Sequence, residues 1–182
     1  MSETTARKKE PGMAQLVLTL FAICAVCAIL LGLMNSVTAA PIQAAKDAKT
    51  AAAMSSVLPA DSYEKMDYTG GDDLVLTLYK AGDAGYVVEV GPTGFGGVID
   101  MMVGVSSDGA VTGVSIISMS ETSGLGANAK KDEFRAQFDG AAEHVSVTKD
   151  GGTIQALTGA TITSRAVSKG VNAALDAVTS LG

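Results

Sequence analysis

Cysteine, histidine and aromatic residues are scarce in this sequence of 182 residues, and tryptophan is absent. The two cysteines lie in an apolar N-terminal stretch, so the rest of the chain has no disulfide and no thiolate set for an iron–sulfur cluster. The single histidine, His144, has no metal-ligand or triad spacing around it and is interpreted as a surface residue. We therefore expect no metal site, no catalytic residue and a core of aliphatic side chains.

Basic residues are also in deficit, since 13 lysines and arginines face 19 acidic residues for a net charge of −6. A chain of this charge is repelled by phosphate backbones, so no nucleic-acid partner is expected. The length suits one domain with accessory segments.

Charge is missing altogether from residues 11–45, and residues 14–34 are almost continuously apolar. About 20 apolar residues span a bilayer as a helix, whereas the apolar core of a signal peptide has about 7–15. The length favours a retained anchor, and the small residues at 37–39 keep a cleaved signal peptide as the alternative. The cysteines of this stretch, Cys24 and Cys27, would leave a metal two ligands short and are interpreted as small apolar helix residues.

Three basic residues, Arg7, Lys8 and Lys9, precede the apolar stretch. Basic residues flanking a membrane helix tend to stay in the cytoplasm. The sequence therefore predicts a single-pass protein of the inner cell membrane, with a cytoplasmic N-terminus and an extracytoplasmic domain.

Periodicity in the rest of the chain predicts an α+β domain. A glycine-rich loop at 91–97 lacks the Gly-Lys-Ser/Thr ending of a phosphate loop. Alternation predicts strands at 74–80, 86–90, 98–105, 110–119 and 144–149. Helical spacing and composition predict helices at 43–58, ended by Pro59, at 130–138, and after the segment 157–164.

Segment 157–164 combines four hydroxyl residues with one glycine, directly before apolar residues spaced for one face of a helix. Serine and threonine are favoured at helix starts because their oxygens accept from free backbone N–H groups, so an ordinary N-cap is one interpretation. The other is an anion site, because the same N–H groups and the helix dipole attract phosphate.

The tetrapeptide Thr158-Gly159-Ala160-Thr161 resembles the flavinylation motif of the RnfG and NqrC family. The resemblance implies that the hydroxyl of Thr161 is esterified to the phosphate of FMN. Residues 162–164 continue as is typical of RnfG, and Gln155 stands where the family motif has aspartate.

A second segment, 121–126, resembles the family's Glu-Thr-Pro-Gly-Leu-Gly loop, with Ser123 in place of proline. Anchor, glycine-rich segment, loop and flavin motif follow one another in the family's order. Besides Thr161, the resemblance implies these cofactor-binding residues: Thr158, Gly159, Ala160, Ser164, Glu121, Thr122, Gly124, Leu125 and Gly126.

The resemblance implies a membrane-anchored electron-transfer subunit with covalent FMN, in an Rnf-type ion-translocating ferredoxin:NAD oxidoreductase. Its expected partners are other membrane subunits of that complex and a flavin transferase that matures it. The expected organisation is a cytoplasmic tail at 1–13, a transmembrane helix at 14–38, a linker helix at 39–60 and an FMN-binding domain at 61–182.

Two alternatives stay open at this point. One is an NqrC-like subunit of a Na⁺-translocating NADH:quinone reductase. The other is an anchored extracytoplasmic binding or scaffold domain without flavin, which Gln155 favours because it departs from the attachment motif.

Overall fold

The computed structural model describes residues 12–181 and divides into two units, Met1–Lys46 and Asp47–Gly182. Helix α1, Met13–Val57, begins in the first unit and ends in the second. It contains a stretch with a mean hydropathy of 2.9, long and apolar enough to cross a membrane. Arg7, Lys8 and Lys9, on which the predicted orientation depends, lie outside the described residues.

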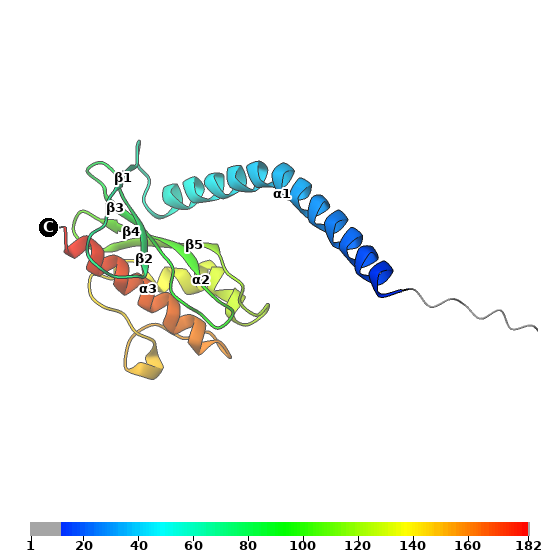
Figure 1. Cartoon of the computed structure of the whole chain (residues 1–182). Helices are drawn as coiled ribbons and strands as arrows, with labels where there is room; N and C mark the ends of the chain where they lie inside the picture. The colour runs from blue at the N-terminus through cyan, green and yellow to red at the C-terminus, as the bar shows by residue number, and fades with distance from the viewer. Residues whose placement is uncertain (1–11, 182) are drawn as a thin grey trace, which may run out of the picture. The chain divides into compact units, whose positions relative to one another are not determined.

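The second unit is built on an antiparallel sheet of five strands that follow one another in chain order (Figure 1). Four of the predicted strands are confirmed, with ends shifted by one or two residues. The short first strand was not predicted. The strands are β1 Glu64–Met66, β2 Val75–Lys80, β3 Gly85–Val90, β4 Asp100–Ser106 and β5 Val111–Ser118.

Each face of the sheet contributes to a hydrophobic cluster, since neighbouring residues of a strand point to opposite faces and those of β4 fall in two separate clusters. In β4, Met101 and Val103 belong to the larger core, whereas Met102 belongs to a smaller cluster. The larger core includes residues of helix α3, Thr161–Thr179, and Figure 1 shows α3 running along the sheet. The smaller cluster includes the last residues of α1.

The end of α1 lies very close to the sheet. A Cβ atom at Gly104 would lie 2.6 Å from the carbonyl oxygen of Val57, and one at Gly113 would lie 3.3 Å from its Cα. The hydroxyl of Thr112 donates to that carbonyl at 2.5 Å. Glycines in β4 and β5 therefore make room for the helix end, and Pro59 follows it as predicted.

The segment between β5 and α3, residues 119–160, is irregular. It contains η1 Gly126–Lys130, α2 Asp132–Arg135 and η2 Ala136–Phe138, so the helix predicted at 130–138 is confirmed as one α-turn extended by 3₁₀ turns. The rings of Phe134 and Phe138 meet edge to face at 5.6 Å.

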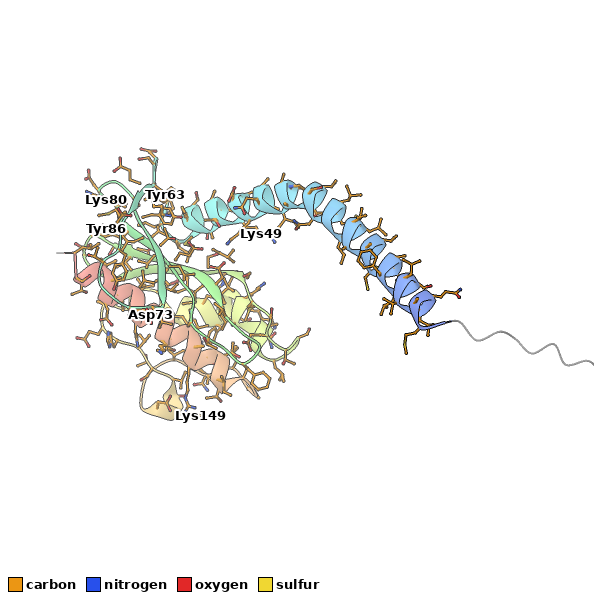
Figure 2. All side chains as sticks on the ribbon, viewed as in Figure 1. Lys49, Tyr63, Asp73, Lys80, Tyr86 and Lys149 are labelled. Atoms are coloured by element: carbon orange, nitrogen blue, oxygen red, sulfur yellow. The ribbon has the colours of Figure 1, made fainter. Side chains whose placement is uncertain are left out.

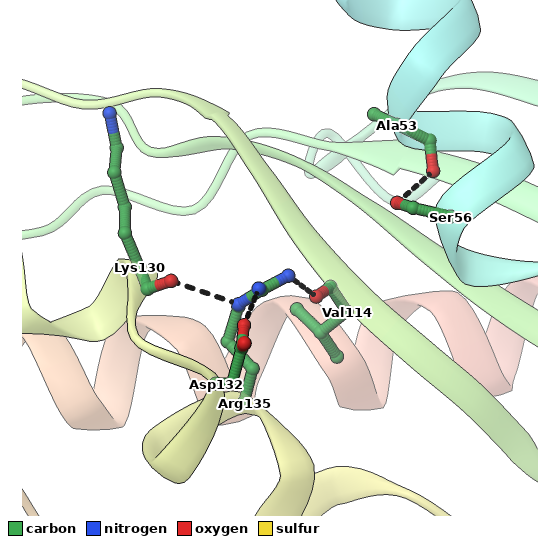
Figure 3. Close-up of polar contacts among 6 residues, drawn as sticks. All are labelled: Ala53, Ser56, Val114, Lys130, Asp132 and Arg135. Atoms are coloured by element: carbon green, nitrogen blue, oxygen red, sulfur yellow. Dashed lines mark hydrogen bonds and ion pairs between the residues drawn. The ribbon is translucent and has the colours of Figure 1, made fainter.

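Arg135 fastens this segment to the sheet (Figure 3). Its guanidinium donates to the carbonyl of Val114 in β5 at 2.7 Å and to that of Lys130 at 3.1 Å, and it pairs with Asp132. Figure 3 also shows Ser56 donating within α1 to the carbonyl of Ala53.

The strand predicted at 144–149 is wrong. Only Val147 forms a bridge there, with Ile154, and η3, Thr148–Asp150, follows. The alternation is real, since Val145 and Val147 both contact the core. However, the Asn172 side chain binds both the N–H and the carbonyl of Val145, at 2.8 and 2.9 Å, where a strand would have a neighbour.

His144 is 61% exposed and its Nε2 lies 2.7 Å from a carboxylate oxygen of Asp176. It is a surface residue, as predicted.

Candidate functional site

A cavity of about 390 Å³ opens at the N-terminus of α3. This volume falls within the range of small-molecule sites, roughly 300–1,000 Å³. The walls come from the glycine-rich loop, the loop after β5, the η3 loop and the start of α3. The lining residues are Phe95, Glu121, Thr122, Leu125, Gly126, Lys149, Gly159, Ala160, Thr161, Ile162 and Thr163.

The hydroxyl groups of the motif differ in their surroundings. The Thr163 side chain is 1% exposed and donates to Glu121 at 2.7 Å. Ser164 is fully buried, donates to the carbonyl of Ala160 at 3.0 Å and accepts from the N–H of Leu157 at 2.9 Å. Thr161 is only half-buried, and its Oγ1 lies on the cavity wall 3.2 Å from Nζ of Lys149. Among the motif hydroxyls that line the cavity, Thr161 is therefore the accessible one.

The expected hydroxyl N-cap is wrong. The N-cap residue is Ala160, and no side chain caps the first turn. The first N–H groups of a helix have no acceptor within the helix, and together with the dipole they favour an anion. Gly159, with φ +74°, turns the chain into the helix in a conformation that residues with a Cβ rarely adopt. The second interpretation of the motif, an anion site, fits this geometry.

Glu121 joins three of the segments around the cavity. One carboxylate oxygen accepts from the N–H of Gly96 at 2.9 Å, and the other accepts from Thr163. A Cβ at Gly126 would lie 2.5 Å from this carboxylate, and one at Gly94 would overlap it. Two glycines thus leave room for a half-buried carboxylate that holds the glycine-rich loop against α3.

The η3 loop carries Lys149 to the cavity, and Figure 2 labels this residue on the loop. Arg165, in the second turn of α3, forms a two-pronged ion pair with Asp150, with distances of 2.7 and 2.5 Å. The hydrogen bond from Arg165 holds the pKa of the Asp150 carboxyl below its usual value, and the same contact raises the pKa of Arg165.

Seven of the ten predicted binding residues line the cavity; they are Glu121, Thr122, Leu125, Gly126, Gly159, Ala160 and Thr161. The other three do not. Ser164 is buried beneath the first turn, and Gly124 is exposed, its carbonyl accepting from Asn128 at 2.8 Å. Thr158 lines a separate hollow of about 240 Å³ together with Gln155.

Sequence reasoning missed Phe95, Lys149, Ile162 and Thr163 as lining residues. Phe95 is 70% exposed between glycines, and such an exposed aromatic in a glycine-rich loop is a usable signal. Lys149 falls at the end of the strand that does not form. Its position follows from the path of the η3 loop, which no local pattern reveals.

The cavity suits a group with an anionic end and a flat apolar body, and FMN has this chemistry. Backbone N–H groups and the Lys149 ammonium lie beside Thr161, and Phe95, Leu125 and Ile162 offer apolar surface. Neutral polar side chains alone would not fit a phosphate as well, because charge-assisted hydrogen bonds are roughly twice as strong.

The residues around the cavity fall within a match to a known protein family. Residues 94–176 match the family described as FMN-binding domain, a range that covers every lining residue named above. The chain is 36% identical over 177 residues to the G subunit of the ion-translocating oxidoreductase complex of Methanosarcina acetivorans, covering 91% of this chain and 94% of that protein.

Two further relatives carry related names. The chain is 40% identical to the G subunit of the Na⁺-translocating ferredoxin:NAD⁺ oxidoreductase complex of Acetobacterium woodii, covering 85% of this chain and 86% of that protein. It is 53% identical over 98 residues to the G subunit of the proton-translocating ferredoxin:NAD⁺ oxidoreductase complex of Clostridium ljungdahlii, an alignment of about half of each chain (52% and 53%). The chain therefore belongs to the G-subunit family of Rnf-type ion-translocating oxidoreductase complexes, and it carries that family's FMN-binding domain.

Proposed function

We propose that this chain is the membrane-anchored, FMN-carrying electron-transfer subunit of a ferredoxin:NAD⁺ oxidoreductase complex, with the FMN phosphate esterified to Thr161. The FMN-binding domain and the relatives named as G subunits support the cofactor and the complex. The apolar part of α1 supports the anchor. Bound FMN would supply one- or two-electron transfer, and the protein would supply attachment, orientation and electrostatics.

The accessible hydroxyl of Thr161 carries the proposal. It is half-buried on the cavity wall, while the neighbouring hydroxyls of Thr163 and Ser164 are buried and engaged in hydrogen bonds. An ester at Thr161 would put the phosphate at the first N–H groups of α3, where the helix dipole favours negative charge. Leu125 and Phe95 would then lie where the ring system extends from the phosphate.

The orientation and the partners form the finer part of the proposal. Basic residues ahead of the apolar stretch favour an orientation with the domain outside the cytoplasm. Ferredoxin and NAD⁺ are cytoplasmic, so the direct electron partners of this flavin are other membrane subunits of the complex. A flavin transferase attaches the cofactor. Protease added to the outer face of the membrane should digest the domain, and digestion only from the cytoplasmic face would reverse the orientation.

Covalent attachment is tested by denaturing electrophoresis of the full chain, because an esterified flavin stays with the denatured band and fluoresces under ultraviolet light. Thr161→Val should abolish the fluorescence and leave a folded domain. Thr158→Val is the matched control, since Thr158 belongs to the motif but lines the other hollow, and it should keep the flavin.

Peptide mapping of the native chain should find FMN mass on Thr161. Flavin on Thr158, Thr163 or Ser164 would contradict the assignment. A native band without fluorescence, from cells that flavinylate other proteins, would favour the scaffold alternative.

A further inference from the structure

We propose that Lys149 is a binding residue for the phosphate of the flavin on Thr161, and that the Asp150–Arg165 ion pair holds it in position. This inference rests on the proposed function and assigns a role to a loop outside the flavin motif. The starting observation is the 3.2 Å contact between Nζ of Lys149 and Oγ1 of Thr161. The oxygens of a phosphate bonded to Oγ1 would lie within reach of the same ammonium.

The backbone around Lys149 is fixed without any ligand. The N–H of Thr148 donates to the carbonyl of Ile154 at 2.9 Å, and the N–H of Gly152 donates to that of Val147 at 3.1 Å. Gly151, with φ +84°, closes the turn directly after η3. A side chain at Gly152 would collide with the backbone of Ser146. Because the main chain is already ordered, binding of the ligand costs little conformational entropy, and this favours affinity.

The ion pair connects this loop to the helix that bears Thr161. Arg165 lies four residues after Thr161, so the two share one face of α3. Both guanidinium contacts reach Asp150, the residue next to Lys149. The Asp150 carboxylate is thereby directed at Arg165, whereas the Lys149 ammonium is directed at Thr161.

The charges within the cavity are arranged asymmetrically. Lys149 is its one cationic lining residue and Glu121 its one anionic lining residue, among residues 12–181. Glu121 faces Gly96 and Thr163, whereas Lys149 faces Thr161. A ligand with a phosphate at one end is therefore attracted in one direction only, with its phosphate toward Lys149.

The test compares two flavins that differ in the phosphate. The full chain carrying Thr161→Val, in detergent, is titrated with FMN and with riboflavin, and binding is followed by flavin fluorescence. Adding Lys149→Met should weaken FMN binding about 10-fold, the loss of one charge-assisted contact, and leave riboflavin binding unchanged. Lys149→Arg should restore most of the FMN affinity. Lys169→Met, an exposed lysine of α3 away from the cavity, is the control and should change neither.

Equal weakening of FMN and riboflavin by Lys149→Met would show a merely structural role and overturn the inference, as would unchanged FMN binding. If the Thr161→Val chain binds neither flavin measurably, occupancy of covalent flavin decides. It should fall several-fold in Lys149→Met and Asp150→Asn and stay at the native level in Lys169→Met. Native occupancy in Lys149→Met overturns this inference alone, whereas a native chain without flavin overturns the proposed function.

Discussion

The ends of the two helices that pack on the sheet differ in how their backbone polar groups are satisfied. We call the last turn of α1 closed, because the carbonyl of Val57 accepts a hydrogen bond from the Thr112 hydroxyl and lies against glycines of the sheet. The first turn of α3 is open, because Ala160 gives no side-chain cap and the turn borders a cavity. Polar groups at a helix end are normally satisfied. The α1 terminus, with its carbonyl hydrogen-bonded, stabilises this fold, and the uncapped α3 terminus borders the cavity that we propose holds the flavin.

Both helices make a close contact at a glycine, but the atoms that approach the glycine differ. A Cβ at Gly104 would collide with the backbone of Val57 and with the Thr112 hydroxyl that binds it. A Cβ at Gly170 in α3 would meet the tip of the Met101 side chain at 2.6 Å and the ring of Pro92 at 2.9 Å. The Met101 tip can move aside more easily than the hydrogen-bonded backbone at Val57, whereas the Pro92 ring must shift with its backbone. The closed contact should therefore tolerate far less change than the contact under α3.

The largest effect on stability is expected for Gly104→Ala. Overpacking of a close contact typically costs about 1–3 kcal/mol, and we expect a loss of that size in the free energy of unfolding. Flavin occupancy should stay unchanged, because the cavity lies on the side of α3. Urea unfolding of the full chain measures the loss. Gly113→Ala, with a closest contact of 3.3 Å, is the graded control and should cost less. If Gly104→Ala and Gly113→Ala lowered the free energy of unfolding equally, the closeness of the contact would not determine the cost.

The next largest effect is expected for Glu121, which joins the glycine-rich loop to the first turn of α3. Glu121→Ala removes both acceptors and should cost about 1–2 kcal/mol, discounted because the carboxylate is partly exposed. Flavin occupancy should fall with it, since Gly96 and Thr163 are no longer joined. Glu121→Gln, which keeps one good acceptor, should retain an intermediate occupancy. Full occupancy in Glu121→Ala would show that the cavity forms without this bridge.

Gly170→Ala should change the free energy of unfolding by less than about 0.5 kcal/mol. Alanine gains up to about 1 kcal/mol in helix propensity over glycine, and displacing both the Met101 tip and the Pro92 ring offsets that gain. The measurement is the same urea unfolding used for Gly104→Ala. A loss as large as that of Gly104→Ala would contradict the distinction between movable and fixed neighbours.

The smallest effect is expected from the Asp150–Arg165 pair, which is exposed and screened by salt. Because Arg165 holds the pKa of Asp150 below its unfolded value near 3.9, the stabilisation is present above about pH 4 and is lost as the pH falls through the lower, folded value. The unfolding free energies of the native chain and Asp150→Asn should differ slightly at neutral pH and converge in acid. A constant difference down to about pH 2 would exclude this cause.

The sequence was sufficient to predict the strands and helices whose apolar residues recur at regular spacing. Alternation in β2 to β5 placed four strands, and apolar spacing in α3 placed Val167, Val171 and Leu175, all of them buried. These patterns are local and record which side chains face the core. Residues 144–149 alternate for the same reason, but a strand also needs a neighbouring strand, and here the Asn172 side chain takes that place.

The site was only partly predictable. The resemblance of the motif and of the loop at 121–126 to the family predicted Thr161 and Glu121, because each lies in a short continuous segment that can be compared directly. Phe95 and Lys149 reach the cavity from positions 66 and 12 residues away from Thr161, through turns whose path depends on tertiary contacts. No hydroxyl caps α3 because Ala160 occupies the N-cap position, while Thr163 and Ser164 lie inside the helix and bind Glu121 and the Ala160 carbonyl.

The chain order of the sheet has a consequence for the time course of folding. Strands that pair with their neighbours in sequence need only short loops to close, so this meander can form early and quickly. The cavity cannot, since its walls are drawn from residues between 95 and 163 and include the last helix. A chain whose Thr161 lies in a finished cavity is therefore a chain that has finished folding. If attachment requires that cavity, the flavin marks each molecule that has reached the native state, and fluorescence counts those molecules directly.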